Sequence, residues 1–280
     1  MPRRACRCNV LFMMQHLIAN LTRFFALGGL LILAIPQSAK ADPPAASVTA
    51  FNNYVGALES RLARQHSAPR GFLAPADAQS GARLRRGELI VENLTPSGTE
   101  LPGAMLHHWR GTAFVPGATA ADFERLMKAF NDYPKHYAPQ VVTAQVLARQ
   151  GDHLQAIMRV RQQHIITVVM DTSYDVNFAR LDALHGYSIS RSTRIAEIAS
   201  PGTRHERALS GSEEHGFLWR LNTYWSYEER DGGVYMQIES VTLTRSIPRG
   251  LGWAVAPFVE AVPRESLEFT LRSTSTALRR

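Results

Sequence analysis

The chain has 280 residues, a formal net charge of +7 and two cysteines. A basic balance spread over a whole molecule suggests a nucleic-acid partner. Here, however, residues 1–41 hold five basic residues and no acidic one. Without them, 26 basic residues face 24 acidic ones, a net charge of +2. We therefore expect no nucleic-acid partner.

The first 41 residues have the three parts of a secretory signal peptide. Arginines precede an apolar core at Phe24–Ile35, and Ala39-Lys40-Ala41 forms a small-x-small cleavage site. The core is about 12 residues long, shorter than the roughly 20 that span a bilayer. We predict a signal peptide over residues 1–41, cleaved after about Ala41, and an exported protein, periplasmic or secreted. An uncleaved membrane anchor is the alternative.

Both cysteines, Cys6 and Cys8, fall in this presequence. A mature chain from about Asp42 would hold no cysteine, so it would have no disulfide, thiol nucleophile or thiolate metal ligand. We expect no cofactor.

The segment 42–103 is predicted to be an N-terminal extension. A Pro-rich linker at 42–50 precedes an amphipathic helix at 51–65, whose apolar residues recur at spacings of three and four. Residues 66–86 are rich in Ala, Gly and Arg, which predicts a loop. Residues 88–94 are predicted to form a strand.

A strand at Met105–Val115 follows, and Thr119 can cap a helix that carries Asp122 in its first turn. Prolines make 132–139 a turn. From there the chain alternates between strands and short turns, which favours an antiparallel sheet. The predicted strands are 141–149, 153–162, 165–178, 187–198, 218–230 and 233–246.

The last two strands carry the strongest pattern. Every second residue from 217 to 227 belongs to a mainly apolar and aromatic set, Phe217, Trp219, Leu221, Thr223, Trp225 and Tyr227. Asp231-Gly232-Gly233 is a hairpin signal. The residues after 250 are predicted to form one short helix with Pro257 as a possible kink, then a second helix from Pro263. Its apolar face would pack on the sheet.

This order of elements resembles the START-like, Bet v 1-like helix-grip superfamily, often labelled polyketide cyclase or SRPBCC proteins. The resemblance covers residues 105–280 and rests on the topology and on GFLWRLNTYWSYEERDGGVY and IPRGLGWAVAPFVEAVPRESLEFTL, which look like an exported bacterial subfamily. It implies an α+β helix-grip fold, a curved antiparallel sheet wrapped around a long C-terminal helix with a hydrophobic cavity between them. Members of the superfamily include carriers, receptors and enzymes, so the resemblance implies no single activity.

Within such a cavity, the aromatic strand face is the best site candidate, with ordinary core packing as the alternative. The candidate cavity residues are Trp109, Tyr174, Trp219, Trp225, Tyr227, Trp253, Phe258 and Val262. Three polar residues could orient a ligand or simply face solvent: Arg159, Arg191 and Tyr137.

Signals for catalysis or metal binding are weak. Adjacent strand residues point to opposite faces, so His107 and His108 are poorly placed to share one metal ion. The sequence has no G-x-S-x-G element and no Gly-rich phosphate loop. We predict no metal site and name no catalytic residue.

The expected function is to bind or carry a hydrophobic small molecule, lipid-like or aromatic, outside the cytoplasm. Transient membrane contact would accompany such a role, and the oligomeric state is left open. A cyclase or aromatase using the same cavity is the second hypothesis, since such sites can work without a recognisable motif. A structural or interaction module with a filled core is the third.

Overall fold

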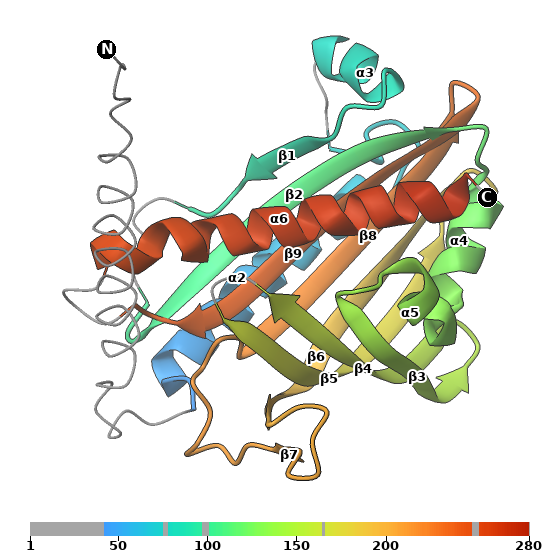
Figure 1. The fold of residues 1–280 in the computed structure, drawn as a ribbon. Coiled ribbons are helices and arrows are strands. Elements are labelled where there is room, and N and C mark those ends of the chain that lie inside the picture. Colours follow the sequence, from blue (N-terminus) through green and yellow to red (C-terminus); the bar gives the residue numbers. More distant parts are fainter. Residues whose placement is uncertain (1–41, 75–77, 97–100, 164–165, 248–251, 280) are drawn as a thin grey trace, which may run out of the picture. The chain divides into compact units, whose positions relative to one another are not determined.

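An antiparallel sheet forms the centre of the protein in this computed structural model (Figure 1). The described residues are 42–74, 78–96, 101–163, 166–247 and 252–279, with the backbone alone for 252–260. They belong to the unit Ala41–Arg280. The expected signal peptide, residues 1–41, lies outside the described residues.

Within the described residues the sheet has nine strands, in the order β1-β2-β9-β8-β6-β5-β4-β3, with β7 paired to β6. Neighbouring strands are antiparallel throughout, which confirms the predicted meander. The strands are β1 (Ile90–Asn93), β2 (Ala104–Pro116), β3 (Val141–Gln150), β4 (His153–Gln163), β5 (Thr167–Arg180), β6 (His185–Ala199), β7 (Arg207–Ala208), β8 (Arg220–Arg230) and β9 (Gly233–Arg245).

The C-terminal helix α6 (Gly252–Leu278) lies along one face of this sheet, here called the α6 face (Figure 1). The approach to β2 is close, because a Cβ atom added at Gly111 would stand 2.6 Å from Leu271 Cδ1. The predicted α+β helix-grip arrangement, a long antiparallel sheet with the C-terminal helix packed on it, is confirmed. The prediction of a second helix from Pro263 is wrong, since α6 is continuous there. Pro263 is an interior position of α6, where it removes a backbone donor and crowds the preceding turn. The packing of Leu267 and Leu271 on the sheet offsets that cost.

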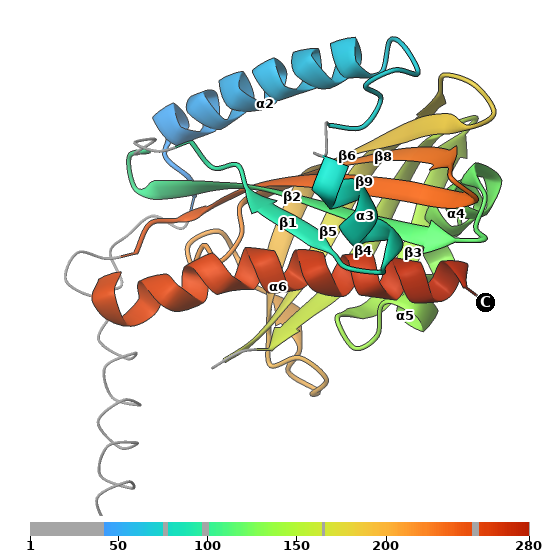
Figure 2. The same ribbon diagram turned by 90° about the horizontal axis from the view of Figure 1, so that it is seen from above.

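The predicted N-terminal helix is also present, as α2 (Ala45–Gln65), and it packs on the opposite face, here called the α2 face (Figure 2). Phe51, Val55, Leu58 and Leu62 meet apolar residues of β2, β8 and β9 in one buried cluster. The partners from the strands and the segment before β8 are Ala104, Leu106, Trp219, Tyr224, Val241 and Leu243. Both faces of the central strands are therefore covered, each by one long helix.

Short helices fill the connections. In α4 (Ala120–Lys128) the predicted cap forms a full capping box between Thr119 and Asp122. The predicted turn at 132–139 contains η2 (Phe130–Asp132) and α5 (Tyr133–His136). The predicted loop at 66–86 contains α3 (Ala78–Arg85). Leu84 of α3 is buried with Phe72 and Phe114, so tertiary packing supports this weakly patterned helix.

The β8–β9 hairpin turns as predicted. Asp231 and Gly232 both have positive φ, 56° and 74°, which is the conformation that tight primed turns require. The turn sets the register that pairs Trp225 with Ile238 and Tyr227 with Met236.

Candidate functional site

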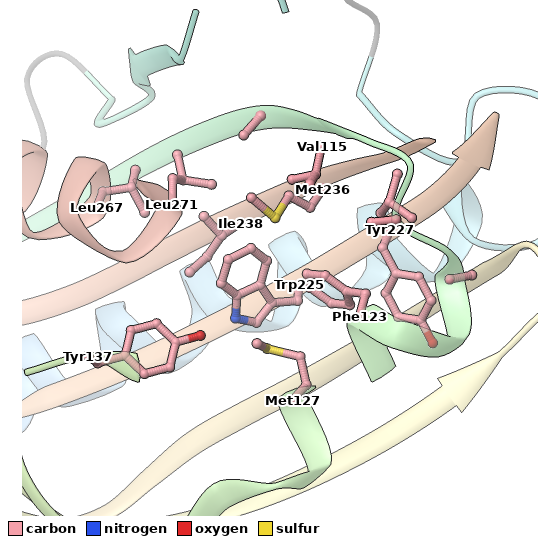
Figure 3. Close-up of a cluster of buried hydrophobic side chains, with 14 residues drawn as sticks. Val115, Phe123, Met127, Tyr137, Trp225, Tyr227, Met236, Ile238, Leu267 and Leu271 are labelled. Carbon is pink, nitrogen blue, oxygen red and sulfur yellow. The ribbon is translucent and has the colours of Figure 1, made fainter. Parts of the chain in front are cut away.

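One part of the α6 face is a filled apolar core (Figure 3). Leu267 and Leu271 of α6 lie in it, with Trp225 and Tyr227 of β8. The Phe123 ring of α4 packs against both, at centroid distances of 5.4 Å from Trp225 and 4.7 Å from Tyr227. These two candidate cavity residues are 8% and 4% exposed. Here they hold the helices to the sheet.

The hydroxyls at the edge of this core have partners within the protein. Tyr137, the α5-side candidate, shares a 2.9 Å hydrogen bond with Thr274 of α6, and burial raises the pKa of Tyr137 to about 12. Tyr227 donates to Glu124, which also pairs with Lys128. These groups brace α4, α5 and α6, so little of their hydrogen-bonding capacity is free for a ligand.

Beyond Gly111, toward Ala104, the same face is less covered. The residues facing α6 are half-buried there, while their chain neighbours facing α2 are buried. On β9, for example, Ser240 and Thr242 are half-buried, whereas Val241 and Leu243 have 0% exposure. The contrast means that α2 covers Val241 and Leu243, whereas the described side chains fill this part of the α6 face incompletely.

A row of polar side chains crosses this part of the sheet. The register pairs Trp109 with Ser240, Ser240 with Thr223, and Thr223 with Ser190, on four successive strands. We call Ser240, Thr223 and Ser190 the hydroxyl row. All three are half-buried, and the described residues offer none of them a hydrogen-bond partner within 3.5 Å. Three neighbouring hydroxyls are thus available on the α6 face.

Trp109 stands at one end of this row. Its indole Nε1 is buried and has no acceptor among the described residues. A buried donor without a partner typically costs about 1–3 kcal/mol, and native structures rarely leave one unexplained. The ring itself packs against the filled core. The N–H is therefore a donor that an oxygen atom of a bound molecule could satisfy.

The other end of the row is apolar. Ser190 pairs with Val176, and Val176 with Leu154. Tyr174, a candidate cavity residue, lies in the same buried cluster, together with Phe130. Burial raises the pKa of Tyr174 above its ordinary value, which keeps the phenol neutral. Across the sheet, the face therefore changes from an indole through three hydroxyls to a buried apolar cluster.

The other predicted site residues lie elsewhere. Trp219 packs with the α2 cluster, on the opposite face from Trp225 and Tyr227. It precedes β8, where strand alternation does not yet apply, so its position in the alternating pattern does not set its face. Val262 is half-buried on α6. The side chains of Trp253 and Phe258 lie outside the described residues.

Both candidate arginines belong to the α2 side of the sheet. Arg191 makes two 2.8 Å hydrogen bonds to Glu59 of α2. Arg159 makes two to Asp171, its cross-strand neighbour, and a third to Glu206. These carboxylates raise the pKa of Arg159 above its usual range. Neither arginine lies on the face that carries the hydroxyl row.

Sequence reasoning missed the hydroxyl row. The alternation of Ser240, Thr242 and Thr244 with Val241 and Leu243 is visible in the sequence. It predicts two faces but does not say which one meets α6, and the apolar set is the natural choice for the interior. That set instead faces α2. A second amphipathic helix in the sequence was the available signal, because a sheet covered on both sides can turn its polar set inward.

The two adjacent histidines lie on opposite faces. His108 is buried under α2, with its Nε2 2.8 Å from Glu239, and His107 is on the α6 face. Within the described ranges, no three His, Cys, Asp or Glu side chains gather as a metal site. Over the same ranges, none of the helices combines the length and apolar character needed to cross a membrane.

Comparison with known proteins finds matches among solved structures alone, all at low identity. No protein-family model and no curated protein match the sequence. A solved STAR-related lipid transfer protein from Xanthomonas axonopodis has 15% identity, a TM-score of 0.44, and coverage of 65% of this chain and 97% of that one. The Zhui aromatase/cyclase from Streptomyces sp. R1128 has 13% identity and a TM-score of 0.43, with coverage of 63% of this chain and 95% of that one. Human STARD10 has 10% identity and a TM-score of 0.41, with coverage of 72% of this chain and 80% of that one.

Proposed function

We propose that this protein binds and carries a largely hydrophobic small molecule that has oxygen atoms along one edge, held between the hydroxyl row and α6. The observation that carries the proposal is the buried indole N–H of Trp109, which has no acceptor among the described residues. It stands in register with three hydroxyls that also lack partners there. An oxygen-bearing ligand would satisfy all four groups.

Affinity would come mainly from apolar burial. Removing apolar surface from water is worth about 25 cal/mol per Å². The half-buried Trp109 ring at one end of the row supplies apolar surface. The hydroxyls would fix the orientation of the ligand, as the few polar groups of a small-molecule site usually do.

Binding suits these side chains better than acid–base catalysis. An enzyme site of the cyclase kind needs titratable groups that converge on one reacting atom. The row supplies neutral hydroxyls and an indole, with His107 as the nearby titratable group on the α6 face. We therefore propose a carrier, and keep a cyclase-type enzyme as the alternative that turnover of a bound polyketide-like substrate would reveal.

We also propose that the protein acts outside the cytoplasm, after cleavage near Ala41. The arginine-rich start, the apolar core Phe24–Ile35 and the small-x-small site support this location. The absence of cysteine after residue 41 suits a chain that needs no disulfide formation after export.

Binding of the uncharged fluorescent probe N-phenyl-1-naphthylamine and native mass spectrometry of freshly purified protein test the carrier proposal. Ser240→Leu replaces a hydroxyl of the row with a bulky apolar side chain beside Trp109, and should abolish probe binding or any co-purifying mass. Trp109→Phe keeps an aromatic ring but loses the N–H, and should weaken binding of an oxygen-bearing ligand about tenfold, or about 1.4 kcal/mol.

Thr143→Leu on β3 is the matched control, because it makes the same kind of change at an exposed position. It should leave binding unchanged. A purified protein that carries no ligand, and binds the probe equally well with Ser240→Leu and without it, would contradict the proposal.

A further inference from the structure

A separate hollow lies on the α2 side of the sheet. Its volume is about 320 Å³, and it opens between α2 and the strands β6 and β8. The residues that matter below are Phe51, Val55, Gly56 and Glu59 of α2, Arg191 of β6 and Arg220 of β8. The hydroxyl row faces the other side of the same strands, so this crevice is distinct from the site proposed above.

The crevice carries one uncompensated positive charge. Glu59 neutralises Arg191 through two 2.8 Å hydrogen bonds, and Tyr224 donates to the same carboxylate at 3.0 Å. Arg220 differs. Its Nη1 donates to the carbonyl of Trp219 at 2.8 Å, and no carboxylate in the described part of the chain lies within 4.0 Å of it. A half-buried guanidinium with spare donors favours an anionic partner.

Glycine at position 56 keeps the crevice open. Gly56 lies in the middle of α2, where glycine is less favourable than alanine because it loses more backbone freedom. A Cβ atom at Gly56 would meet no heavy atom within 4 Å. Close packing therefore does not require glycine here. What a side chain would do is occupy the hollow above Arg191 and Arg220.

We propose that this crevice binds a small organic oxyanion, a carboxylate or phosphate attached to a ring-sized apolar group. Arg220 would donate to the oxyanion, and the apolar part would rest against the wall that Val55 and Gly56 form. The volume is near the lower end of the range for small-molecule sites, roughly 300–1,000 Å³, which suits one ring with its acidic group. Free metabolites and lipid head groups both present this chemistry.

Isothermal titration calorimetry of the full protein with phenyl phosphate and with benzoate tests the proposal, with benzyl alcohol as the neutral analogue. We expect the two anions to bind and the alcohol to bind at least tenfold more weakly. Added salt should weaken the anions, because a half-exposed charge is screened. Sedimentation with phosphatidylglycerol vesicles is the second arm, and it reports whether a head group is the source of the oxyanion.

Two variants remove the site in different ways. Arg220→Gln removes the charge and should weaken phenyl phosphate at least tenfold. Gly56→Leu fills the hollow and should do the same while improving helix propensity, so that a folding defect cannot explain its effect. The matched controls are Arg64→Gln and Ala57→Leu, which change exposed positions on α2 outside the crevice and should bind as the unchanged protein does.

The outcomes separate clearly. Loss of anion binding in Arg220→Gln and Gly56→Leu, with both controls unchanged, supports the crevice site. Vesicle binding with the same dependence supports it with a lipid head group as the source. No anion binding at millimolar concentration, equal binding of benzyl alcohol, or binding that survives both variants overturns it. The Ser240→Leu variant should leave this binding intact, so failure here is distinguishable from failure of the carrier proposal.

Discussion

At the scale of single residues, the most consequential group is a carboxylate buried beneath α2. Glu239 is 2% exposed and lies 2.8 Å from His108 Nε2 and 2.5 Å from Arg61 Nη2. The Tyr54 hydroxyl completes the network at 2.7 Å from His108 Nδ1. Burial alone would raise the pKa of Glu239, but these donors hold it below its ordinary value of 4.5. Both Arg61 and Tyr54 come from α2, so the network ties that helix to the sheet.

Glu239→Gln should therefore destabilise the protein at neutral pH. We expect the free energy of unfolding to fall by about 1–3 kcal/mol, because donors to a buried carboxylate lose a charged acceptor. A depressed carboxyl pKa stabilises the fold above pH 4.5, and that stabilisation is lost as the pH falls through the folded-state pKa. Urea unfolding at several pH values should show the difference from the unchanged protein shrinking in acid. Glu88→Gln, at an exposed ion pair, should show little difference at any pH.

His66 affects the pH dependence of stability at higher pH than Glu239 does. Its Nε2 lies 2.7 Å from Ser226 Oγ, and its ring stacks on Tyr187 at 4.3 Å. Burial, assisted by the positive charge of Arg61, lowers the pKa of His66 from 6.5 to about 4. Between pH 6.5 and about 4, His66 is protonated in the unfolded chain but neutral in the folded protein. The free energy of unfolding should therefore decline as the pH falls through this range.

A His66→Phe variant tests that window. It keeps an aromatic ring beside Tyr187 but cannot titrate, so its stability should change less between pH 6.5 and 4 than that of the unchanged protein. Thermal unfolding followed by circular dichroism at each pH gives the two slopes. If stability changes equally with pH in the variant and in the unchanged protein, His66 is not the cause of the pH dependence.

At the scale of elements, α2 behaves as part of the core. Its residues Phe51, Val55, Leu58 and Leu62 are all buried on the sheet. An antiparallel sheet commonly leaves one face to solvent, but here the second face carries apolar side chains such as Val241 and Leu243. Without α2 these side chains would be exposed to water.

Phe51→Ala should thus be strongly destabilising, although the residue lies outside the segment that resembles the helix-grip superfamily. Truncating a fully buried phenylalanine costs about 3–5 kcal/mol. Chemical denaturation should show a loss of this size, with Asn53→Ala, at an exposed position of the same helix, as the control. A loss below about 1 kcal/mol would mean that α2 is a dispensable appendage.

The docking of α6 depends on the absence of a side chain at Gly111. A Cβ there would meet Leu271 at 2.6 Å and Leu267 at 3.1 Å. Gly111→Val should push α6 off β2 and cost about 1–3 kcal/mol or more, as overpacking of a filled core does. Hydrogen exchange should show faster exchange in α6 with little change in the distant strands β3 and β4. Uniformly faster exchange would instead indicate global destabilisation.

At the scale of the whole molecule, the charge balance and the presequence lead to one prediction. If residues 1–41 are a cleaved signal, protein recovered from its native cells should begin near Asp42. Its intact mass and N-terminal sequence measure this directly. Its formal charge should drop from +7 to +2, because the removed segment holds five basic residues and no acidic one. Recovery of the uncleaved chain would contradict the proposed export.

Much of the fold was predictable from local signals. The strands β2 to β6, the β8–β9 hairpin and the cap of α4 follow from alternation, turn residues and capping chemistry, all of which act between near neighbours in the chain. The short helices α3 and α5 were not predictable in this way. They depend on contacts such as Leu84 with Phe114, which no window of the sequence contains.

The candidate site, like the fold, was predictable only in the features that depend on neighbouring residues of the chain. By itself, the sequence determined which side chains share a face, because successive residues of a strand must point to opposite sides. Only the tertiary structure decided which face is inner and which helix covers it. The α2 helix covers Val241 and Leu243 of β9, so the hydroxyls of Ser240 and its neighbours turn toward α6. Trp219 and Trp225 have the same place in the alternation of the sequence, but Trp219 precedes β8 and packs with the α2 cluster. Only the packing shows that these two side chains lie on opposite faces, because packing joins residues far apart in the chain.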